Sequence, residues 1–361
     1  MEAAAEMYQA FRERADGVVL CAQPLVGLFG DGIPEALVSA SDARPVDVKA
    51  PPLADGRGGP IFPAVSAVVE RFMDDFATRF LHRLAAGAFD KFDLIVFARD
   101  DVAALTAYQY AQELRRQGAI PDQTPRFHLW NFIHTDSDAA EAFNRLELDR
   151  LTQTLCEVSG TTLCQDTLAE AVKTEKVRAT ILDQFDVHDA ETFVWRNAGR
   201  WMTAGRHVEL LREIPVKASE QDNRRIGLVG TACDLPVLHE VCGSFGTVVA
   251  DLQPYGQVWP ANNSGPEDTV GMLRHLARYP LHIRTNPPGR YTDMLIEKLA
   301  GCDLVVSSVD RNDDSFGWEV PVLRQRLAAT GTTVVDLGFR PFRPGPDWIE
   351  TAREAIQEAL Q

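Results

Sequence analysis

The sequence predicts an α/β protein with two Rossmann-like or flavodoxin-like parallel-sheet units and a helical section between them. Short apolar, β-branched runs alternate with stretches of helical spacing in the first and last thirds of the chain, and strand signals stop between them. The run at 92–97 is apolar almost throughout, as in strands that are buried on both faces of a parallel sheet. We therefore divide the chain into an N-terminal α/β domain (1–137), a helical section (138–222) and a C-terminal α/β domain (223–361).

Composition limits the class of protein further. The chain has 361 residues, of which 45% are hydrophobic and 24% charged, which is typical of a folded multi-domain protein. Its net charge of −16 repels nucleic-acid phosphates and anionic lipid head groups, so we expect neither nucleic acid nor a membrane as a partner. The first residues lack the basic start and apolar stretch of a secretory signal, and we expect a cytoplasmic protein.

The N-terminal domain opens with a predicted strand at 17–21. Glycines and a proline at 30–37 then predict a loop followed by the start of a helix, because proline suits the first helical turn. A second strand is predicted at 45–48, and 65–89 has helical apolar spacing. After the strand at 92–97 come a helix over 102–117 and a strand at 127–132.

The remaining elements follow the same reasoning. Helix formers dominate the middle of the chain and predict helices over 139–155, 167–185 and 190–211. In the last domain we expect four strands, at 224–229, 246–251, 302–308 and 332–337. A helix over 349–360 closes the domain.

Charged side chains follow several of these strands. Because a parallel sheet binds ligands beyond the carboxyl ends of its strands, five side chains are candidate catalytic groups: Glu35, Arg99, Asp100, Asp310 and Arg311. The structural alternative is that arginines and aspartates here neutralise one another at a domain interface. We expect the two α/β domains to enclose a cleft that these side chains line.

Small residues at the same strand ends are candidate cofactor contacts. The turn Gly230-Thr231 follows a strand and precedes a helix, where backbone N–H groups can hold an anion, although a purely structural turn explains it equally simply. No dinucleotide or P-loop fingerprint is present in the sequence. The candidate cofactor-binding residues are Gly32, Pro34, Gly230, Thr231, Ser307 and Ser308.

The order of these segments resembles the 2-hydroxyacyl-CoA dehydratase and benzoyl-CoA reductase family. Residues 32–40 look like the helix that begins valine-proline-glutamate-glutamate in that family, and 93–101 resemble its strand ending in a cysteine-aspartate pair. The helical middle and the segments 225–231 and 246–251 are similar to the rest of the family pattern, so the resemblance runs from about residue 17 to residue 337.

The resemblance implies a dimer of related subunits that act on acyl-CoA thioesters through an iron–sulfur cluster. Such a cluster needs several thiolates. The resemblance implies that the cluster ligands lie at three places, which are Arg99-Asp100, 285–288 and 309–311 in this sequence. None of these positions is a cysteine. We therefore predict no cofactor and no metal in this chain, and a 4Fe–4S cluster only in a partner subunit.

The six cysteines form no C-x-x-C pair and are interpreted as plain thiols, with Cys233 the one whose pKa a helix start could lower. Two classes of function remain. In the first, the chain is a diverged dehydratase or reductase subunit that places an acyl-CoA thioester beside a related cluster-bearing subunit, in a heterodimer or a homodimer. A variant of this class is an enzyme that uses the polar cleft between its domains for a different reaction. In the second, it is a non-catalytic scaffold or binding subunit.

Overall fold

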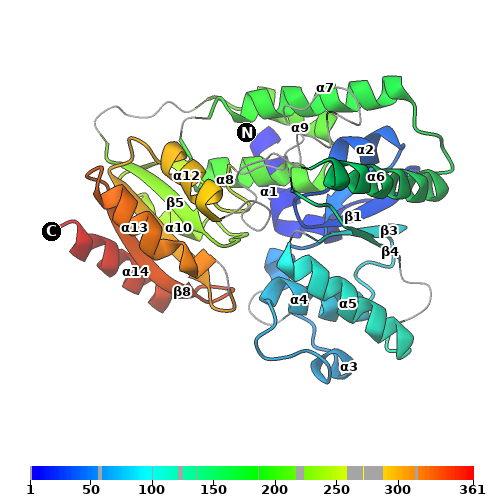
Figure 1. Ribbon diagram of the computed structural model, residues 1–361, viewed down its shortest axis with the longest axis horizontal. Coiled ribbons are helices and arrows are strands. Elements are labelled where there is room, and N and C mark those ends of the chain that lie inside the picture. Colours follow the sequence, from blue (N-terminus) through cyan, green and yellow to red (C-terminus); the bar gives the residue numbers. More distant parts are fainter. Residues whose placement is uncertain are drawn as a thin grey trace. The chain divides into compact units, whose positions relative to one another are not determined.

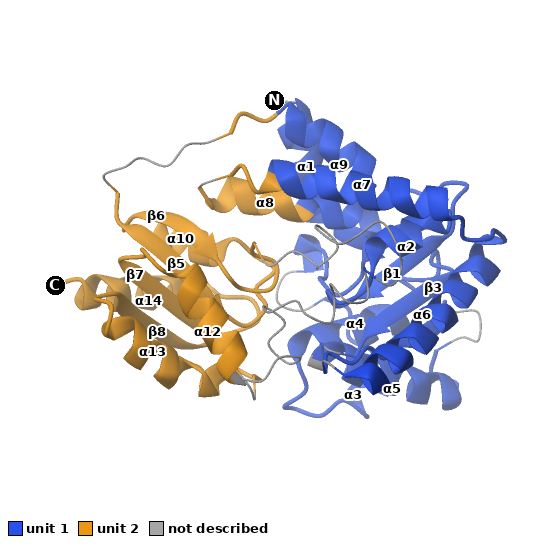
Figure 2. Cartoon of the chain, turned by 45° about the horizontal axis from the view of Figure 1, so that its top comes forward, with its two compact units in different colours: residues 1–181, 198–213, 260–279 blue, residues 182–197, 214–259, 280–361 orange. Residues whose placement is uncertain are grey.

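The computed structural model describes residues 2–55, 59–99, 101–120, 125–135, 137–185, 187–216, 223–257, 271, 288–313 and 316–361. These residues form two compact units (Figure 2). Unit 1 holds the described residues within 1–181, 198–213 and 260–279, and unit 2 those within 182–197, 214–259 and 280–361. Each unit contains a four-stranded sheet whose neighbouring strands are parallel. The predicted α/β fold with two parallel sheets is confirmed, while the three-part domain division stays a prediction.

Most of the elements that lie wholly or mainly in unit 1 are labelled in Figure 1. They are α1 (Glu2–Glu13), η1 (Arg14–Gly17), β1 (Leu25–Phe29), α2 (Glu35–Ala40), β2 (Arg44–Asp47), η2 (Leu53–Asp55), α3 (Pro63–Ser66), α4 (Asp75–Ala85), β3 (Leu94–Ala98), α5 (Val102–Arg116), β4 (Arg126–Trp130), α6 (Asp138–Ser159), α7 (Gln165–Leu182), η3 (Gly199–Trp201) and α9 (Ala204–Arg212).

The strand predicted at 17–21 is wrong. Residue 17 ends η1, and the following Val19 and Leu20 are 75% and 67% exposed, which no strand in the middle of a sheet allows. The first strand is β1, whose five residues are all buried between two neighbouring strands. Cys21 therefore lies outside the sheet. The β-branched pair misled the prediction because intrinsic strand preference is weaker than burial.

The helix predicted over 65–89 is also interrupted. It consists of α3 and α4, and α4 begins after Asp74, whose carboxylate accepts hydrogen bonds from the N–H groups of Phe76 and Ala77. Such an N-cap satisfies the first free donors of a helix, so the chain starts a new helix at this point.

Helices cover both faces of the unit 1 sheet. On one face, α2, α6 and α7 contribute Leu37, Leu151 and Leu168 to a buried core. On the other face, Phe80 of α4 packs edge-on against Phe29 of β1, with ring centroids 5.0 Å apart. Because apolar side chains project from both faces of the sheet, its strands are continuous hydrophobic runs in the sequence, as predicted for β3.

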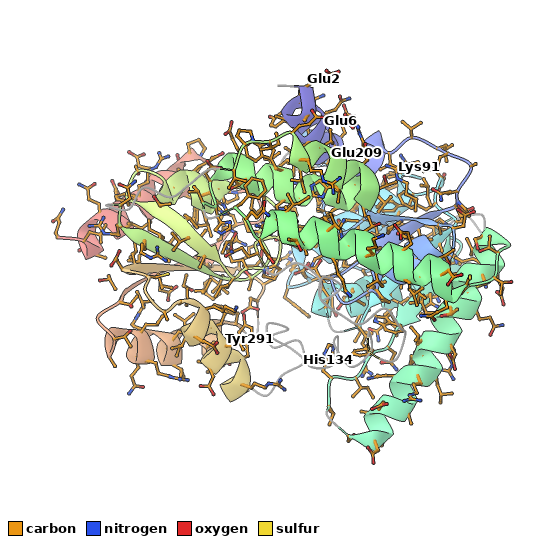
Figure 3. The ribbon with its side chains drawn as sticks, turned by 90° about the horizontal axis from the view of Figure 1, so that it is seen from above. Glu2, Glu6, Lys91, His134, Glu209 and Tyr291 are labelled. Atoms are coloured by element: carbon orange, nitrogen blue, oxygen red, sulfur yellow. The ribbon has the colours of Figure 1, made fainter. Side chains whose placement is uncertain are left out.

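The helix α9 is attached to α1 within unit 1. Figure 3 shows Glu6 of α1 and Glu209 of α9 close together on these neighbouring helices. Arg206 joins them, with Nη2 2.6 Å from a Glu6 carboxylate oxygen and Nη1 2.8 Å from one of Glu209. The segment at 198–213 thus belongs structurally to the N-terminal sheet, although it follows the helical middle of the chain.

Unit 2 has the same kind of architecture. Its elements are α8 (Ala190–Ala198), β5 (Arg225–Gly230), α10 (Val237–Cys242), β6 (Thr247–Asp251), α12 (Pro288–Lys298), β7 (Leu304–Asp310), η5 (Phe316–Trp318), α13 (Val320–Ala328), β8 (Thr333–Arg340) and α14 (Pro346–Ala359). One face of its sheet packs on α10 and α14 and the other on α12 and α13. The sequence analysis found every strand of this unit but neither α12 nor α13.

The two sheets are ordered alike. Strand order is β2-β1-β3-β4 in unit 1 and β6-β5-β7-β8 in unit 2, so in both the second strand of the chain lies on one side of the first and the third on the other. The pairing near the end of the first strand also agrees, because Leu28 pairs with Asp47 and Leu228 with Asp251, although the register of β5 and β6 shifts between Ile226 and Gly227. Among the described helices, none is long and apolar enough to cross a membrane.

Candidate functional site

A small polar recess lies in unit 1 at the carboxyl ends of β1 and β2. Its free interior of about 10 Å³ is about the room that one water molecule needs. The strand ends place its side chains there, since loops at this edge of a parallel sheet converge on one region. The lining residues are Leu28, Gly30, Asp31, Ile33, Glu35, Pro45, Val46, Asp47, Gly199 and Arg200.

Arg200 connects the two strand ends inside this recess. Its Nη1 donates to Asp31 Oδ1 at 2.7 Å and lies 3.5 Å from Asp47 Oδ2. Asp31 follows β1 and Asp47 ends β2, whereas Arg200 belongs to η3. The guanidinium is 3% exposed, so these charge-assisted contacts operate where water screens them weakly.

Behind the recess, Glu35 belongs to a second buried ion pair. Arg178 of α7 donates from Nη2 to Glu35 Oε2 at 2.9 Å and also contacts Glu175 one turn away on the same helix. All three side chains are at least nine-tenths buried. Glu35, the first residue of α2, is therefore held by a cation from the helical section, 143 positions along the chain.

Several charged side chains of unit 1 lie close together here. Two guanidinium groups contact four carboxyl groups, of which the first is half-buried and the others are buried: Asp31, Glu35, Asp47, Glu175, Arg178 and Arg200. The buried ammonium group of Lys49 adds a third positive charge that acts on Asp47. Burial raises the pKa of Asp47 to about 6, against the opposing attraction of Arg200. Burial likewise raises the pKa of Glu175, although Arg178 opposes it. Asp47 can therefore hold a proton in weakly acidic solution, which is what a general acid or a hydrogen-bond donor needs.

The other predicted residues of this region have structural contacts. The carbonyl of Gly32 accepts a hydrogen bond from the indole N–H of Trp130 at 2.9 Å, and Pro34 is the residue directly before α2. Arg99 follows β3 and donates from Nη1 to Asn131 Oδ1 at 2.5 Å. Gly32, Pro34 and Glu35 thus come together at the start of α2, and Asp100 lies outside the described residues.

In unit 2, the predicted turn packs tightly on the neighbouring strand. Gly230 has a φ of +142°, and a Cβ there would stand 1.9 Å from the carbonyl oxygen of Ser308, so only glycine fits. Thr231 accepts a hydrogen bond from the backbone N–H of Asp310 at its Oγ1. Asp310 itself accepts one from the N–H of Asn312. Gly230, Thr231, Ser308 and Asp310 therefore form one cluster at the carboxyl edge of the sheet.

Ser307 and Ser308 point to opposite faces of β7, as successive strand residues do. Ser308 accepts from Arg340 Nη1 at 3.1 Å. Ser307 is 1% exposed, and its hydroxyl has no hydrogen-bond partner within the part of the chain that the structure describes. Arg311 is exposed and donates its backbone N–H to the carbonyl of Arg340. The predicted cleft that would join this cluster to the residues of unit 1 stays a prediction.

The cysteines do not suit an iron–sulfur cluster. In unit 2, Cys233 and Cys242 belong to the core on one face of the sheet and Cys302 to the core on the other, so these three thiols cannot converge. Burial raises the pKa of each, for Cys242 to about 12, which keeps them as thiols. The expectation of a lowered pKa for Cys233 is therefore wrong, because desolvation outweighs the charges nearby.

The arrangement of the described side chains does not suit a metal ion either. Within the described ranges, no three side chains of His, Cys, Asp or Glu gather as a metal ion requires. In unit 1, Cys21 and Cys164 are exposed and Cys156 is half-buried. The thiolate set that a cubane needs is not assembled from the described thiols of either unit taken by itself.

Sequence reasoning missed most of the recess. Asp31 and Asp47 directly follow or end strands, and the rule that was applied to the other strand ends could have found them. Arg178 and Arg200 carry no such local signal. They reach their partners across 143 and 169 positions of the chain, and only the packing of α7 and η3 on the sheet brings them there.

Two parallel sheets with helices on both faces define a doubly wound α/β protein, with charged side chains at the carboxyl edges of its sheets. The family model described as 2-hydroxyglutaryl-CoA dehydratase, D-component, matches residues 32–339. The chain therefore belongs to that family. No curated protein matches the chain.

Proposed function

We propose that this chain is a diverged D-component subunit that places an acyl-CoA-type substrate beside a related, cluster-bearing subunit and binds no cluster itself. The observation that carries the proposal is the polar recess of unit 1, where the buried carboxyl group of Asp47 lies beside the guanidinium of Arg200. Family membership supports the broader role as a subunit of a 2-hydroxyacyl-CoA dehydratase or benzoyl-CoA reductase system.

The chemistry of the recess suits placement of a polar substrate group. The guanidinium of Arg200 is a donor type that binds carbonyl or hydroxyl oxygens, and Asp47 can hold a proton in weakly acidic solution because burial raises its pKa to about 6. Glu35 supports this arrangement from the start of α2, where Arg178 fixes its carboxylate. A low-potential electron would have to come from the partner, since the described thiols of this chain do not form a thiolate cage.

Two alternatives use the same residues differently. A non-catalytic scaffold or binding subunit would keep the fold and treat the buried ion pairs as structure alone. An enzyme with repurposed polar chemistry would use Asp47 as a general acid without any partner. Thioester binding and pairing with a related subunit together exclude the enzyme that needs no partner. Tight thioester binding without turnover in the paired complex favours the non-catalytic binding subunit, whereas turnover favours the proposed function.

The test is calorimetric titration of the oxygen-free chain with acetyl-CoA, alone and after co-expression with a related subunit. Glu35→Gln keeps an acceptor for Arg178 but removes a charge that lines the recess, and we expect acetyl-CoA binding to weaken about tenfold, as for loss of one charge-assisted hydrogen bond. The matched control is Glu209→Gln, at an exposed acid on α9, which should leave binding unchanged.

Iron analysis and size-exclusion chromatography complete this experiment. The proposal expects a mixed dimer and no stoichiometric iron in the isolated chain. A chain that remains a monomer and ignores acetyl-CoA refutes it, and so does a cubane that the isolated chain retains after desalting.

A further inference from the structure

Arg340 is the last residue of β8 and one of the most deeply buried cations of unit 2. It is 2% exposed. Its Nη1 donates to Ser308 Oγ at 3.1 Å and its Nη2 to the carbonyl oxygen of Ala232 at 2.8 Å. A guanidinium has five N–H donors, so these two contacts leave three for other acceptors.

The positive charge of Arg340 is not neutralised by an ion pair. No carboxylate among the described residues lies within ion-pair distance of its guanidinium, and both of its hydrogen-bond acceptors are neutral. The neighbouring Arg343 differs, since it makes a bidentate pair with Asp234 at 2.6 and 2.8 Å. The buried Asp310 stands opposite Arg340 in the register of β7 and β8, but no ion pair joins these two described side chains. A buried charge without an ion pair is costly, and proteins normally pair it or use it to bind a ligand.

Unit 1 shows that the structural contact needs no charge. Its last strand β4 ends in Trp130, whose indole N–H donates to the carbonyl of Gly32 at 2.9 Å. Gly32 and Ala232 are equivalent positions, because each lies two residues after a glycine with positive φ at the end of the first strand of its sheet. The same loop carbonyl is thus held by a neutral indole in unit 1 and by a guanidinium in unit 2. Holding the loop does not explain the charge of Arg340.

The loop beside Arg340 offers further donors. Within the part of the chain that the structure describes, the backbone N–H groups of Ala232 and Cys233 have no hydrogen-bond partner. Ala232 is half-buried and Cys233 is buried. The close approach of Gly230 to Ser308 fixes where this loop starts. Free amides next to an arginine fork are a combination that binds oxyanions.

We propose that Arg340 and the loop at 231–233 form a binding site for a phosphate group, either free or as part of a phosphoester. The guanidinium supplies charge and paired donors, which match phosphate oxygens, and the amide of Ala232 supplies an uncharged donor beside it. The amide of Cys233 points away from the guanidinium, because the carbonyl of the same trans peptide group accepts from Arg340. This site lies entirely within unit 2. It does not depend on the proposed function, whose carrying residues belong to unit 1.

The test uses the full chain, with inorganic phosphate and adenosine 3′,5′-bisphosphate as separate probes. Calorimetric titration measures affinity, and hydrogen exchange of the peptide that contains residues 231–233 locates the site. We expect both probes to bind and to slow exchange of that peptide. Arg340→Gln, which keeps a side-chain donor for Ala232 but removes the charge, should weaken both probes about tenfold or more. Arg340→Lys should retain part of the affinity.

The matched control is Arg353→Gln, which removes one positive charge from the exposed face of α14 and should change neither affinity.

The two probes distinguish the two sources of the phosphate group. Much tighter binding of the bisphosphate, lost in Arg340→Gln, identifies a nucleotide-type phosphoester, whereas equal affinities identify free phosphate. If Arg340→Gln does not fold, Arg340→Lys and the exchange of peptide 231–233 in the native chain carry the test. Absence of binding in the native chain overturns the proposal, as do unchanged affinities in Arg340→Gln or protection elsewhere. Phosphate binding without acetyl-CoA binding would refute the proposed function and leave this site standing.

Discussion

The two units share a sheet plan but differ in what they place at its carboxyl edge. In both, an aspartate lies opposite the fourth residue of the first strand, as Asp47 in unit 1 and Asp251 in unit 2. Asp47 meets the guanidinium of Arg200, and Asp251 meets the imidazole of His239 at 3.1 Å. The same backbone position is therefore kept while its electrostatic environment changes.

The partners come from different distances in the chain. His239 lies on α10, the helix that connects β5 to β6 in the sequence, so both members of the pair in unit 2 come from neighbouring elements of the chain. Arg200 comes from η3, which lies within the helical section and follows α6, α7 and α8. Unit 1 thus depends on a remote segment to complete its edge. The difference shows that the repeated sheet fixes where a polar side chain stands, and that the added helices decide its chemistry.

The largest expected difference between the two units is the loss of stability when the glycine at the end of the first strand is replaced. An alanine Cβ at position 230 would meet the Ser308 carbonyl at 1.9 Å, which only a backbone shift can relieve, and φ is +142°. At position 30, φ is +102° but the nearest contacts of a Cβ are side-chain atoms at 3.0 and 3.1 Å. We expect Gly230→Ala to lower the free energy of unfolding by about 4 kcal/mol or more, and Gly30→Ala by about 1–3 kcal/mol.

Urea unfolding of both variants, followed by circular dichroism, measures these values. Equal losses would show that the two strand ends are packed alike and would remove this part of the comparison. Gly118→Ala is a suitable control, because its φ is +68° but a Cβ there has no neighbour within 4 Å, so it reports backbone strain alone.

The second difference is the pH dependence of stability that the two aspartates impose. Burial raises the pKa of Asp47 to about 6, so the folded state binds a proton more tightly than the unfolded state. Its contribution is present below about pH 4 and is lost as pH rises to about 6, up to about 3 kcal/mol. For Asp251, burial is the largest single influence and pushes the pKa upward, but the contact with His239 and the hydrogen bonds from Gln253 together outweigh it and lower the pKa. Its contribution is present above pH 3.8 and is lost as pH falls.

Stability curves of Asp47→Asn and Asp251→Asn between pH 3 and pH 8 test these opposite signs. Relative to the native chain, Asp47→Asn should lose less stability as pH rises from about 4 to 6, and Asp251→Asn should lose less as pH falls below 4. Slopes of the same sign in both variants would contradict the distinction between an acid that holds its proton and one that is ionised.

The contrast between the units also explains what the sequence could predict. Strands such as β3 and β7 are continuous apolar runs, so their position and parallel pairing follow from local pattern. The first strand was misplaced because Val18 and Val19 resemble a strand, whereas burial selects the run that contains Gly27. The burial of β1 depends on β2 and β3, which no local window records.

The site follows the same rule. Glu35, Gly230 and Ser308 were predictable because strand ends and helix starts have local signals. Arg200 and Arg340 were not. Their partners Asp31 and Ala232 lie 169 and 108 positions away, and the contacts exist only after each sheet is assembled.

The smallest expected effect concerns a contact that the two units share. Asp93, just before β3, accepts the N–H of Leu25 at 2.9 Å, and Asp303, just before β7, accepts the N–H of Arg225 at 2.8 Å. Both aspartates are exposed, so Asp93→Ala and Asp303→Ala should each cost about 1 kcal/mol, the usual value of one hydrogen bond. Asn at either position keeps an acceptor and should restore most of that loss in urea unfolding. Equal costs would mark this contact as part of the common plan. A cost confined to one unit would show instead that the start of the first strand, like its end, has diverged between the two sheets.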